Sequence, residues 1–376
     1  MDLLKQGVNR PKRLLSLDGG GIRGIIAAEV LIRMEDLLRA HNPNWTCLAD
    51  YFDFIGGTST GSILAAALAK GMSARQVRDF YIESGSSIFR KRWNMVQRFW
   101  STYSPQALEA KLQEEFQDTE LGSEKLKTLL LIVAKNATTG ETWFFVNNPK
   151  GRYYKNDKAL KLRDLIRASS AAPTFFPPHP ILTVSGKYEF IDGGMSMFNN
   201  PSFQLFLEAT KPEYNVGWET GADKVLLISV GTGSGNPAVE PVGRVGRFNM
   251  VDWARYAAST LMDDANLQQN AIINLISYQP RSQTDEKDAV ESLVNPMRHV
   301  ELTATNQLLT YHRYTVALTP KRLQSLRLGN TTLGDIDANA VSRMDNVEEI
   351  ANFRRIGQAI AHEQVDAADF AGFLHP

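Results

Sequence analysis

The chain repeatedly places a short apolar segment directly before a loop of small residues. This arrangement occurs four times, at "LDGGG" (17–21), "IGGTSTG" (55–61), "IDGG" (191–194) and "SVGTG" (229–233). Each apolar segment predicts a buried strand, while intervening stretches such as 25–40 carry apolar residues at helical spacing. Alternating strands and helices predict an α/β fold with a mostly parallel sheet. Ligands bind at the carboxyl ends of such strands, so the four loops predict one crowded site.

Other segments add detail to this prediction. The stretch 126–147 predicts two strands joined by a turn at Gly140, and 312–319 predicts a late strand. The polar stretch 325–340 predicts a loop, as does the proline-rich segment around His179.

Composition excludes several classes of protein. The chain has 376 residues and equal numbers of basic and acidic side chains, 41 of each, so it lacks the basic field of a nucleic-acid-binding protein. Cys47 is the only cysteine, which excludes an intrachain disulfide and a cysteine metal cluster; no metal is expected. No apolar run reaches membrane-spanning length, and the first residues lack the core of a signal peptide. We expect a cytoplasmic protein that contacts the inner face of the membrane only peripherally.

The segment from Gly57 to Gly61 matches the pattern G-x-S-x-G, with Ser59 at its centre. It lies between an apolar strand and a helix of small residues, which is the setting of a nucleophile elbow. In such an elbow the serine sits in a strained turn and exposes its hydroxyl, while small neighbours allow the turn to form. The alternative interpretation is a tight strand–helix turn in which Ser59 merely caps the helix.

A nucleophilic serine needs a base, which is usually histidine. His179, His299 and His312 are candidates, but none follows a strand on a small-residue loop. Asp192 does occupy such a loop, and a buried carboxylate of raised pKa can accept a proton from serine. Asp-Gly is also a common turn, so the residues alone leave both interpretations of Asp192 open.

The first loop has the spacing Gly19-x-Gly21-x-x-Gly24, which is typical of a dinucleotide-binding turn. That function requires an acidic residue about 20 positions further on, at the end of the second strand, to bind a ribose. Here Glu35 and Asp36 fall inside the first predicted helix instead, which disfavours a dinucleotide-binding oxidoreductase.

A second interpretation of the same loop is favoured. Backbone N–H groups that converge at the start of a helix can stabilise an oxyanion, and Arg23 adds a cation beside them. The loop at 18–24 would then serve the reaction of Ser59.

Together these motifs resemble the patatin-like phospholipase family. The resemblance rests on "DGGGIRG" (18–24), "GTSTG" (57–61) and "DGG" (192–194), in this order, and on connecting segments such as "ASSAAPTFFPP" (168–178). Specific motifs cover roughly residues 12–235. The third motif reads DGG where many members have DGA, and both leave a small residue after the aspartate.

The resemblance implies a three-layer α/β fold and a Ser–Asp dyad, with Ser59 as nucleophile and Asp192 as base. It implies an oxyanion hole formed by the amides of Gly20 and Gly21 with Arg23 close by. It also implies hydrolysis of membrane phospholipid esters without a metal or other cofactor. The glycines expected to shape the three loops are Gly19, Gly24, Gly57, Gly61, Gly193 and Gly194. We expect one domain over residues 1–376, with a helical C-terminal extension at 236–376.

Control and membrane access are further expectations. Some bacterial members of the family are anti-phage effectors activated by a cyclic nucleotide. A cyclic dinucleotide activator and a homo-oligomer are therefore expected here. The alternative is a constitutive lipid-metabolic esterase. Arg244 and Arg247 are candidate anion contacts. Segment 88–100 mixes basic and aromatic residues, which is typical either of an interfacial segment or of a cationic loop packed on the protein.

Overall fold

The computed structural model describes residues 3–4, 10–88, 102–235, 243, 245–280 and 307–374. The basic and aromatic segment 88–100 therefore lies outside the described residues from residue 89 onward, and so do His299 and Arg244. Within the described ranges, no helix combines the length and the apolar character needed to cross a bilayer.

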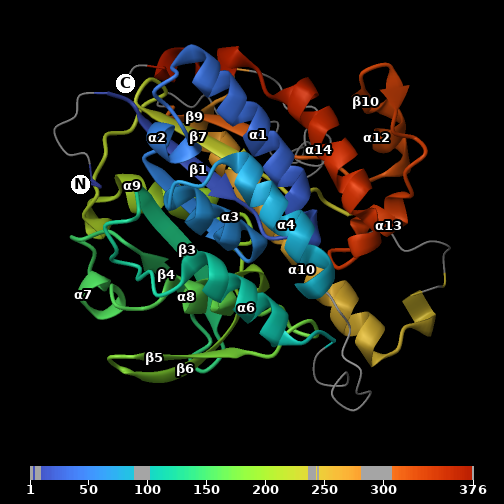
Figure 1. The fold of residues 1–376 in the computed structure, drawn as a ribbon, viewed down its shortest axis with the longest axis horizontal. Helices are drawn as coiled ribbons and strands as arrows, with labels where there is room; N and C mark the ends of the chain where they lie inside the picture. Colours follow the sequence, from blue (N-terminus) through green and yellow to red (C-terminus); the bar gives the residue numbers. More distant parts are fainter. Residues whose placement is uncertain are drawn as a thin grey trace.

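Six neighbouring strands of the central sheet run parallel, which confirms the predicted mostly parallel α/β fold (Figure 1). In spatial order these strands are β3 (Leu129–Asn136), β2 (Phe54–Thr58), β1 (Lys12–Leu17), β7 (Val225–Val230), β9 (Leu309–Tyr314) and β8 (Ser277–Tyr278). Strand β1 lies between β2 and β7, so the loops that leave all three reach the same edge of the sheet.

Three further strands extend the sheet beside β3, and they run antiparallel to their partners. These strands are β4 (Thr142–Val146), β5 (His179–Thr183) and β6 (Gly186–Asp192). The sequence predicted the β3–β4 pair with its turn, and Gly140 has φ 78° there. The direction of β6 was not predicted. Because β6 pairs Asp192 with Ala134, its carboxyl end stops beside the second half of β3, close to the end of β2.

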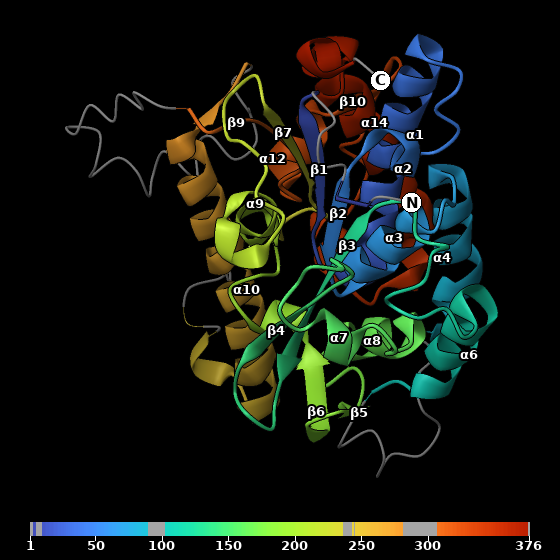
Figure 2. The same cartoon turned by 90° about the vertical axis from the view of Figure 1, so that its left-hand side faces the viewer.

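Helices cover both faces of the sheet and give the expected three layers (Figure 2). One face is covered by α1 (Gly24–His41), α3 (Thr60–Ala69), α4 (Ala74–Ile88), α6 (Pro105–Phe116), α8 (Leu162–Ser169) and α14 (Ile350–Gln364). The other face is covered by α9 (Ser202–Thr210) and α10 (Met250–Ile276). Figure 1 places α14 alongside α1, so the last long helix packs against the first.

The remaining described elements are short. They are α2 (Leu48–Tyr51), α7 (Tyr154–Asp157), α12 (Pro320–Ser325), α13 (Ala338–Ser342), the two-stranded ribbon β10 (Arg327–Leu328) and β11 (Thr331–Thr332), and the 3-10 helices η1 (Gly21–Arg23), η2 (Gly193–Met195), η3 (Pro212–Tyr214), η4 (Val245–Arg247), η6 (Val347–Glu349) and η7 (Ala367–Phe373).

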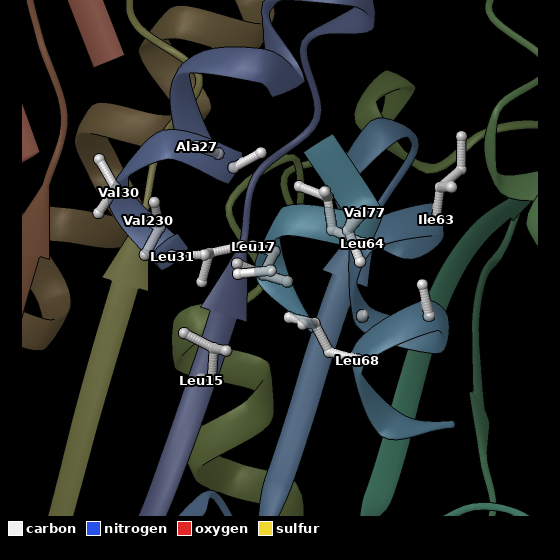
Figure 3. Close-up of a cluster of buried hydrophobic side chains, with 14 of the residues drawn as sticks. Leu15, Leu17, Ala27, Val30, Leu31, Ile63, Leu64, Leu68, Val77 and Val230 are labelled. Atoms are coloured by element: carbon white, nitrogen blue, oxygen red, sulfur yellow. The ribbon is translucent and has the colours of Figure 1, made fainter. Parts of the chain in front are cut away.

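Apolar side chains fill the space on both faces of the sheet. Successive residues of a strand point to opposite faces, so Leu15 and Leu17 of β1 pack under the α1 and α3 layer (Figure 3), whereas Leu14 packs toward α9. All three leucines are fully buried. This packing fixes the end of β1, from which the glycine loop begins.

Two predicted loops contain regular structure. His179 and Pro180 begin β5, which pairs with β6 and is an edge strand of the sheet. Proline is tolerated on an edge strand because its missing N–H is not needed by a neighbour. The polar stretch 325–340 contains the β10–β11 ribbon and the start of α13. The late strand predicted at 312–319 begins earlier, at Leu309, and ends at Tyr314.

Candidate active site

Ser59 occupies the sharp turn between β2 and α3. Its backbone has φ 53° and ψ −123°, a conformation that costs an L-residue free energy and is typical of a nucleophile elbow. Gly57 and Gly61 make the turn possible: a Cβ on Gly57 would lie 2.0 Å from the Gly61 carbonyl oxygen, and a Cβ on Gly61 would lie 2.1 Å from the Leu17 carbonyl oxygen. The turn is therefore packed directly against the end of β1.

A serine from another element holds the elbow in place. The backbone N–H of Ser59 donates to Ser169 Oγ at 2.8 Å, and Ser169 Oγ donates to the Val133 carbonyl at 2.6 Å. Ser169 ends α8, and Val133 belongs to β3. The strained turn is thus tied to both the sheet and the helix layer.

Asp192 ends β6 and faces Ser59. Ser59 Oγ donates to Asp192 Oδ2 at 2.5 Å, while Asp192 Oδ1 accepts the N–H of Gly194 at 2.7 Å. The Asp192 N–H donates to the Ala171 carbonyl at 3.0 Å. A Cβ on Gly193 would lie 2.4 Å from the Val133 carbonyl oxygen, so glycine is needed for Asp192 to approach β3. Both carboxylate oxygens are therefore oriented by hydrogen bonds.

The environment of Asp192 suits a base. Only 4% of the residue is exposed, and burial raises the pKa of its carboxyl to about 6, although the hydrogen bonds from Ser59 and Gly194 oppose part of this rise. A carboxylate with a pKa near 6 is ionised at neutral pH and accepts a proton more readily than an ordinary aspartate does. The arrangement can draw the proton from the Ser59 hydroxyl during an attack.

The loop after β1 lies against this pair. A Cβ on Gly20 would lie 2.0 Å from Thr232 Oγ1, and one on Gly21 would lie 2.1 Å from the Met344 carbonyl oxygen. Gly21 also has φ 61°, which favours glycine. Neither the Gly20 nor the Gly21 N–H donates to another described residue. Two backbone donors are thus available beside Ser59. The other motif glycines, Gly19, Gly24 and Gly194, also approach side-chain atoms within 3 Å of where a Cβ would stand.

Residues near the end of the chain fix this loop, and no motif predicted their role. Arg313 of β9 makes a two-pronged ion pair with Asp18, with distances of 2.9 and 2.6 Å, and both side chains are 3% exposed. The Met344 carbonyl accepts the N–H of Ile22 at 2.9 Å. The glycine loop is therefore held by residues of the C-terminal region, which comprises α10 and residues 307–374.

Arg23 is buried, but it does not line the cavity at Ser59. Its Nη1 donates to the Ser342 carbonyl at 3.2 Å, and its charge interacts with Asp263 of α10. Burial lowers the pKa of the Arg23 guanidinium and raises that of the Asp263 carboxyl to about 6. The Arg23 side chain thus points toward Ser342 and Asp263, whereas Gly20 and Gly21 line the cavity together with Ser59.

A mostly apolar cavity opens above the pair. Ser59, Asp192, Gly20 and Gly21 lie at its polar end. Aromatic and aliphatic side chains form most of its remaining wall: Ile22, Ile63, Tyr81, Ile88, Leu108, Phe175, Phe176, Met195, Met262 and Met344. Such a cavity accommodates a long apolar group next to a reactive hydroxyl.

Histidine does not contribute to this site among the described residues. His312 lies in β9, with Nδ1 3.8 Å from Asp369 Oδ1, and His179 Nε2 lies 3.5 Å from Asp164 Oδ1. Neither lines the cavity. The described ranges also contain no cluster of three or more histidine, cysteine or acidic side chains placed to bind a metal ion.

The sequence of the chain is similar to those of known proteins. The family model for "Patatin-like phospholipase" matches residues 15–205. The chain is 34% identical over 231 residues to a "cGAMP-activated phospholipase" of Escherichia coli (strain TW11681), covering 60% of this chain and 63% of that protein. It is 33% identical over 239 residues to "Patatin-T5" of Solanum tuberosum, covering 59% of this chain and 60% of that protein.

A second bacterial relative gives a similar result. A "cGAMP-activated phospholipase" of Vibrio cholerae serotype O1 (strain ATCC 39315 / El Tor Inaba N16961) is 32% identical over 248 residues, covering 62% of this chain and 68% of that protein. The matches thus span roughly three fifths to two thirds of the relatives' own lengths. The residues that the family model matches, 15–205, contain the elbow, the aspartate and the glycine loop. The chain belongs to the patatin-like phospholipase family.

Proposed function

We propose that this protein is a lipid acyl hydrolase of the phospholipase A type, with Ser59 as nucleophile and Asp192 as base. One observation carries the proposal: the 2.5 Å hydrogen bond from Ser59 Oγ to a buried carboxylate, at the polar end of an apolar cavity. Ester hydrolysis would then proceed in two half-reactions through an acyl-enzyme.

In the first half-reaction, Ser59 Oγ attacks the carbonyl carbon of a bound ester while Asp192 takes the hydroxyl proton. The carbonyl oxygen becomes an oxyanion, and the N–H groups of Gly20 and Gly21, which bond no other described residue, would stabilise it. The bond to the leaving oxygen then breaks, and Asp192 returns the proton to that oxygen. The products are the alcohol, such as a lysophospholipid, and an acyl ester on Ser59.

In the second half-reaction, water replaces the alcohol. Asp192 takes a proton from the water as its oxygen attacks the acyl carbon, and the same two amides stabilise the second oxyanion. The bond to Ser59 Oγ breaks, the proton returns to Ser59, and the fatty acid leaves. The apolar wall of the cavity, including Phe175, Phe176 and Met262, would hold the acyl chain during both steps.

Membrane contact forms part of the proposal. Met195 lines the cavity and is 36% exposed, and Met197 nearby is 48% exposed. On α10, Met262 lines the cavity while its neighbour Leu261 is 66% exposed. Exposed apolar side chains beside the cavity favour docking on the surface of a bilayer, from which a phospholipid could enter.

A cyclic dinucleotide activator is proposed from the relatives. Two of them are named cGAMP-activated phospholipases, and this chain is similar to each over about three fifths of its length. The chemistry of Ser59 would then be switched by a ligand bound elsewhere on the protein, in a homo-oligomer. A constitutive esterase would instead be equally active with and without the ligand.

Hydrolysis of phospholipid vesicles tests both parts of the proposal. The wild type, Ser59→Ala and Asp192→Ala are incubated with vesicles, with and without a panel of cyclic dinucleotides, and released fatty acid is measured. Ser87→Ala is the control, since the Ser87 Oγ bond among the described residues stays within its own helix, at the Ser84 carbonyl. We expect hydrolysis by the wild type and the control, stimulated by one ligand, and none by the other two variants. Full activity of folded Asp192→Ala would contradict the dyad.

A further inference from the structure

The segment 169–171 bridges the two proposed catalytic residues. Ser169 Oγ accepts the N–H of Ser59 at 2.8 Å, and the Ala171 carbonyl accepts the N–H of Asp192 at 3.0 Å. Ser170 stands between these contacts, directly after α8, and it lines the cavity together with Ser59 and Asp192. The backbone therefore places Ser170 beside both reacting groups.

The side chain of Ser170 is buried without a hydrogen-bond partner. The residue is 8% exposed, and its Oγ bonds no described residue. Ser170 ends α8 through its backbone, whose N–H donates to the Ile166 carbonyl at 2.9 Å. The hydroxyl takes no part in this contact. Leaving a buried hydroxyl unpaired is unfavourable, so such a group on a residue that lines a binding cavity points to a partner in the ligand or in bound water.

The proposed reaction has one position at which an oxygen atom needs such a partner. The leaving oxygen of the first half-reaction receives a proton from Asp192, and the water oxygen of the second half-reaction gives a proton to Asp192. Both oxygens must therefore occupy the same place, next to Asp192 and in reach of the carbon bonded to Ser59. The glycine amides bind the carbonyl oxygen of the ester. They therefore leave the second oxygen, which is first the leaving oxygen and then the water oxygen, without a donor.

We propose that the Ser170 hydroxyl is the binding group for this second oxygen, donating a hydrogen bond to the leaving oxygen and then holding the hydrolytic water. Ser170 gives up no proton in either step; Asp192 carries the proton in both. This inference rests on the proposed hydrolysis, and it assigns to the same site a polar contact beyond the dyad and the oxyanion hole.

Leaving-group dependence tests this role. A poor leaving group, such as an alkoxide, needs a hydrogen bond as its bond to carbon breaks, whereas p-nitrophenolate needs little help. For Ser170→Ala we expect kcat/KM to fall about tenfold on an alkyl ester, a loss of the order of one hydrogen bond, and less than about threefold on the p-nitrophenyl ester of the same acid. Ser170→Thr, which keeps a hydroxyl, should recover part of the alkyl-ester activity.

Ser277→Ala is the matched control. Ser277 of β8 is also 8% exposed, and its Oγ likewise bonds no described residue, but Ser277 does not line the cavity. Both alanine variants should unfold at the wild-type temperature or slightly above it, because each loses a hydroxyl that bonds no described residue. Only Ser170→Ala should discriminate between the two esters.

The outcomes separate this role from the proposed function. If the wild type is active and Ser170→Ala loses activity equally on both esters, the proposed role of Ser170 is overturned while the proposed hydrolysis stands. The same holds if Ser170→Ala loses no activity on either ester. A lowered unfolding temperature in Ser170→Ala also overturns it, since the hydroxyl would then support the fold. A wild type that hydrolyses neither ester, under any ligand condition, overturns the proposed hydrolysis and this role together.

Discussion

The motif region and the C-terminal region contribute different things to the site. The motif region, within residues 15–205, supplies Ser59, Asp192 and the glycine loop. The C-terminal region, defined here as α10 and residues 307–374, contributes few groups to the cavity. Instead it holds the glycine loop through Arg313 and the Met344 carbonyl, and it holds the segment after Asp192 through Asn266. The motif region thus carries the reacting groups and part of their positioning, and the C-terminal region adds buried contacts that hold the same loops.

This division has a consequence for mutations. A variant in the motif region that changes a reacting group should lose activity while the protein stays folded. A variant in the C-terminal region should first lose stability, because it removes a buried contact rather than a reacting group. Five measurements on variants and on the wild type distinguish these two kinds of change.

Asp192→Asn should separate activity from stability most strongly. The amide keeps the shape of the carboxylate but cannot take the Ser59 proton, so kcat/KM should fall about 10³-fold or more. The protein should nevertheless be more stable at pH 8. We expect ester hydrolysis near zero together with a raised unfolding temperature.

The sign of the stability change follows from the raised pKa. A carboxyl with a pKa of about 6 when folded and 3.8 when unfolded stabilises the fold fully below pH 3.8 and loses this contribution as the pH rises through 6. At about 1.4 kcal/mol per pH unit, the ionised carboxylate costs the wild type up to about 3 kcal/mol at pH 8. A variant less stable than the wild type at pH 8 would contradict this reasoning.

Arg313→Met should lower the free energy of unfolding by about 3–5 kcal/mol, because it leaves the buried Asp18 carboxylate without its cation. Urea denaturation measures the change. The control is Arg75→Met, which breaks a two-pronged pair with Asp36 on the surface and should cost less than about 1 kcal/mol. If the two variants lowered the free energy of unfolding equally, the C-terminal region would not hold the loop as described.

The pH profile should report Asp192. Because the base must be ionised, kcat/KM of the wild type should fall about tenfold for each pH unit below about 6 and level off above it. Asp157→Asn is the control: burial raises the pKa of Asp157 to about 6 as well, but Asp157 does not line the cavity. A profile that shifts in Asp157→Asn would mean that a different group governs the rate.

Asn266→Ala should have the smallest effect. It removes the acceptor of the 3.1 Å hydrogen bond from Asn199 Nδ2, and Asn199 is 2% exposed. We expect a loss of about 1 kcal/mol in the free energy of unfolding and a few-fold loss of activity, as the segment after Asp192 loosens. A loss of activity as large as that of Asp192→Asn would place α10 in the chemistry instead of the scaffold.

Local patterns predicted the parts of the site that depend on local structure. The spacing of Gly57, Ser59 and Gly61 identified the elbow, since the strained turn needs small residues at fixed positions. Asp192 was a candidate because it follows a strand and precedes two glycines, but only the family resemblance gave it the role of base. The parallel strands followed from the alternation of apolar strands and amphipathic helices.

Long-range pairings could not be predicted in this way. Nothing in the residues of β6 indicates that it runs antiparallel to β3, because direction depends on which strand it meets. Arg313 looks like any strand arginine until Asp18 is placed beside it. The sequence placed Arg23 at the oxyanion loop by proximity in the chain, yet its side chain turns toward Ser342. Ser170 lies beside Ser169 in the segment 168–178, and only the geometry distinguishes the two serines.

Ser59 is proposed to be a nucleophile that Asp192 activates. Labelling with a fluorophosphonate, followed by mass measurement of the intact protein and of its peptides, reports this activation on the reacting atom itself. At pH 8, with the activating ligand if one is needed, the wild type should gain a single adduct on Ser59, and Asp192→Asn should gain it at least about 100-fold more slowly. An adduct on another residue, or labelling of Asp192→Asn at the wild-type rate, would contradict the claim.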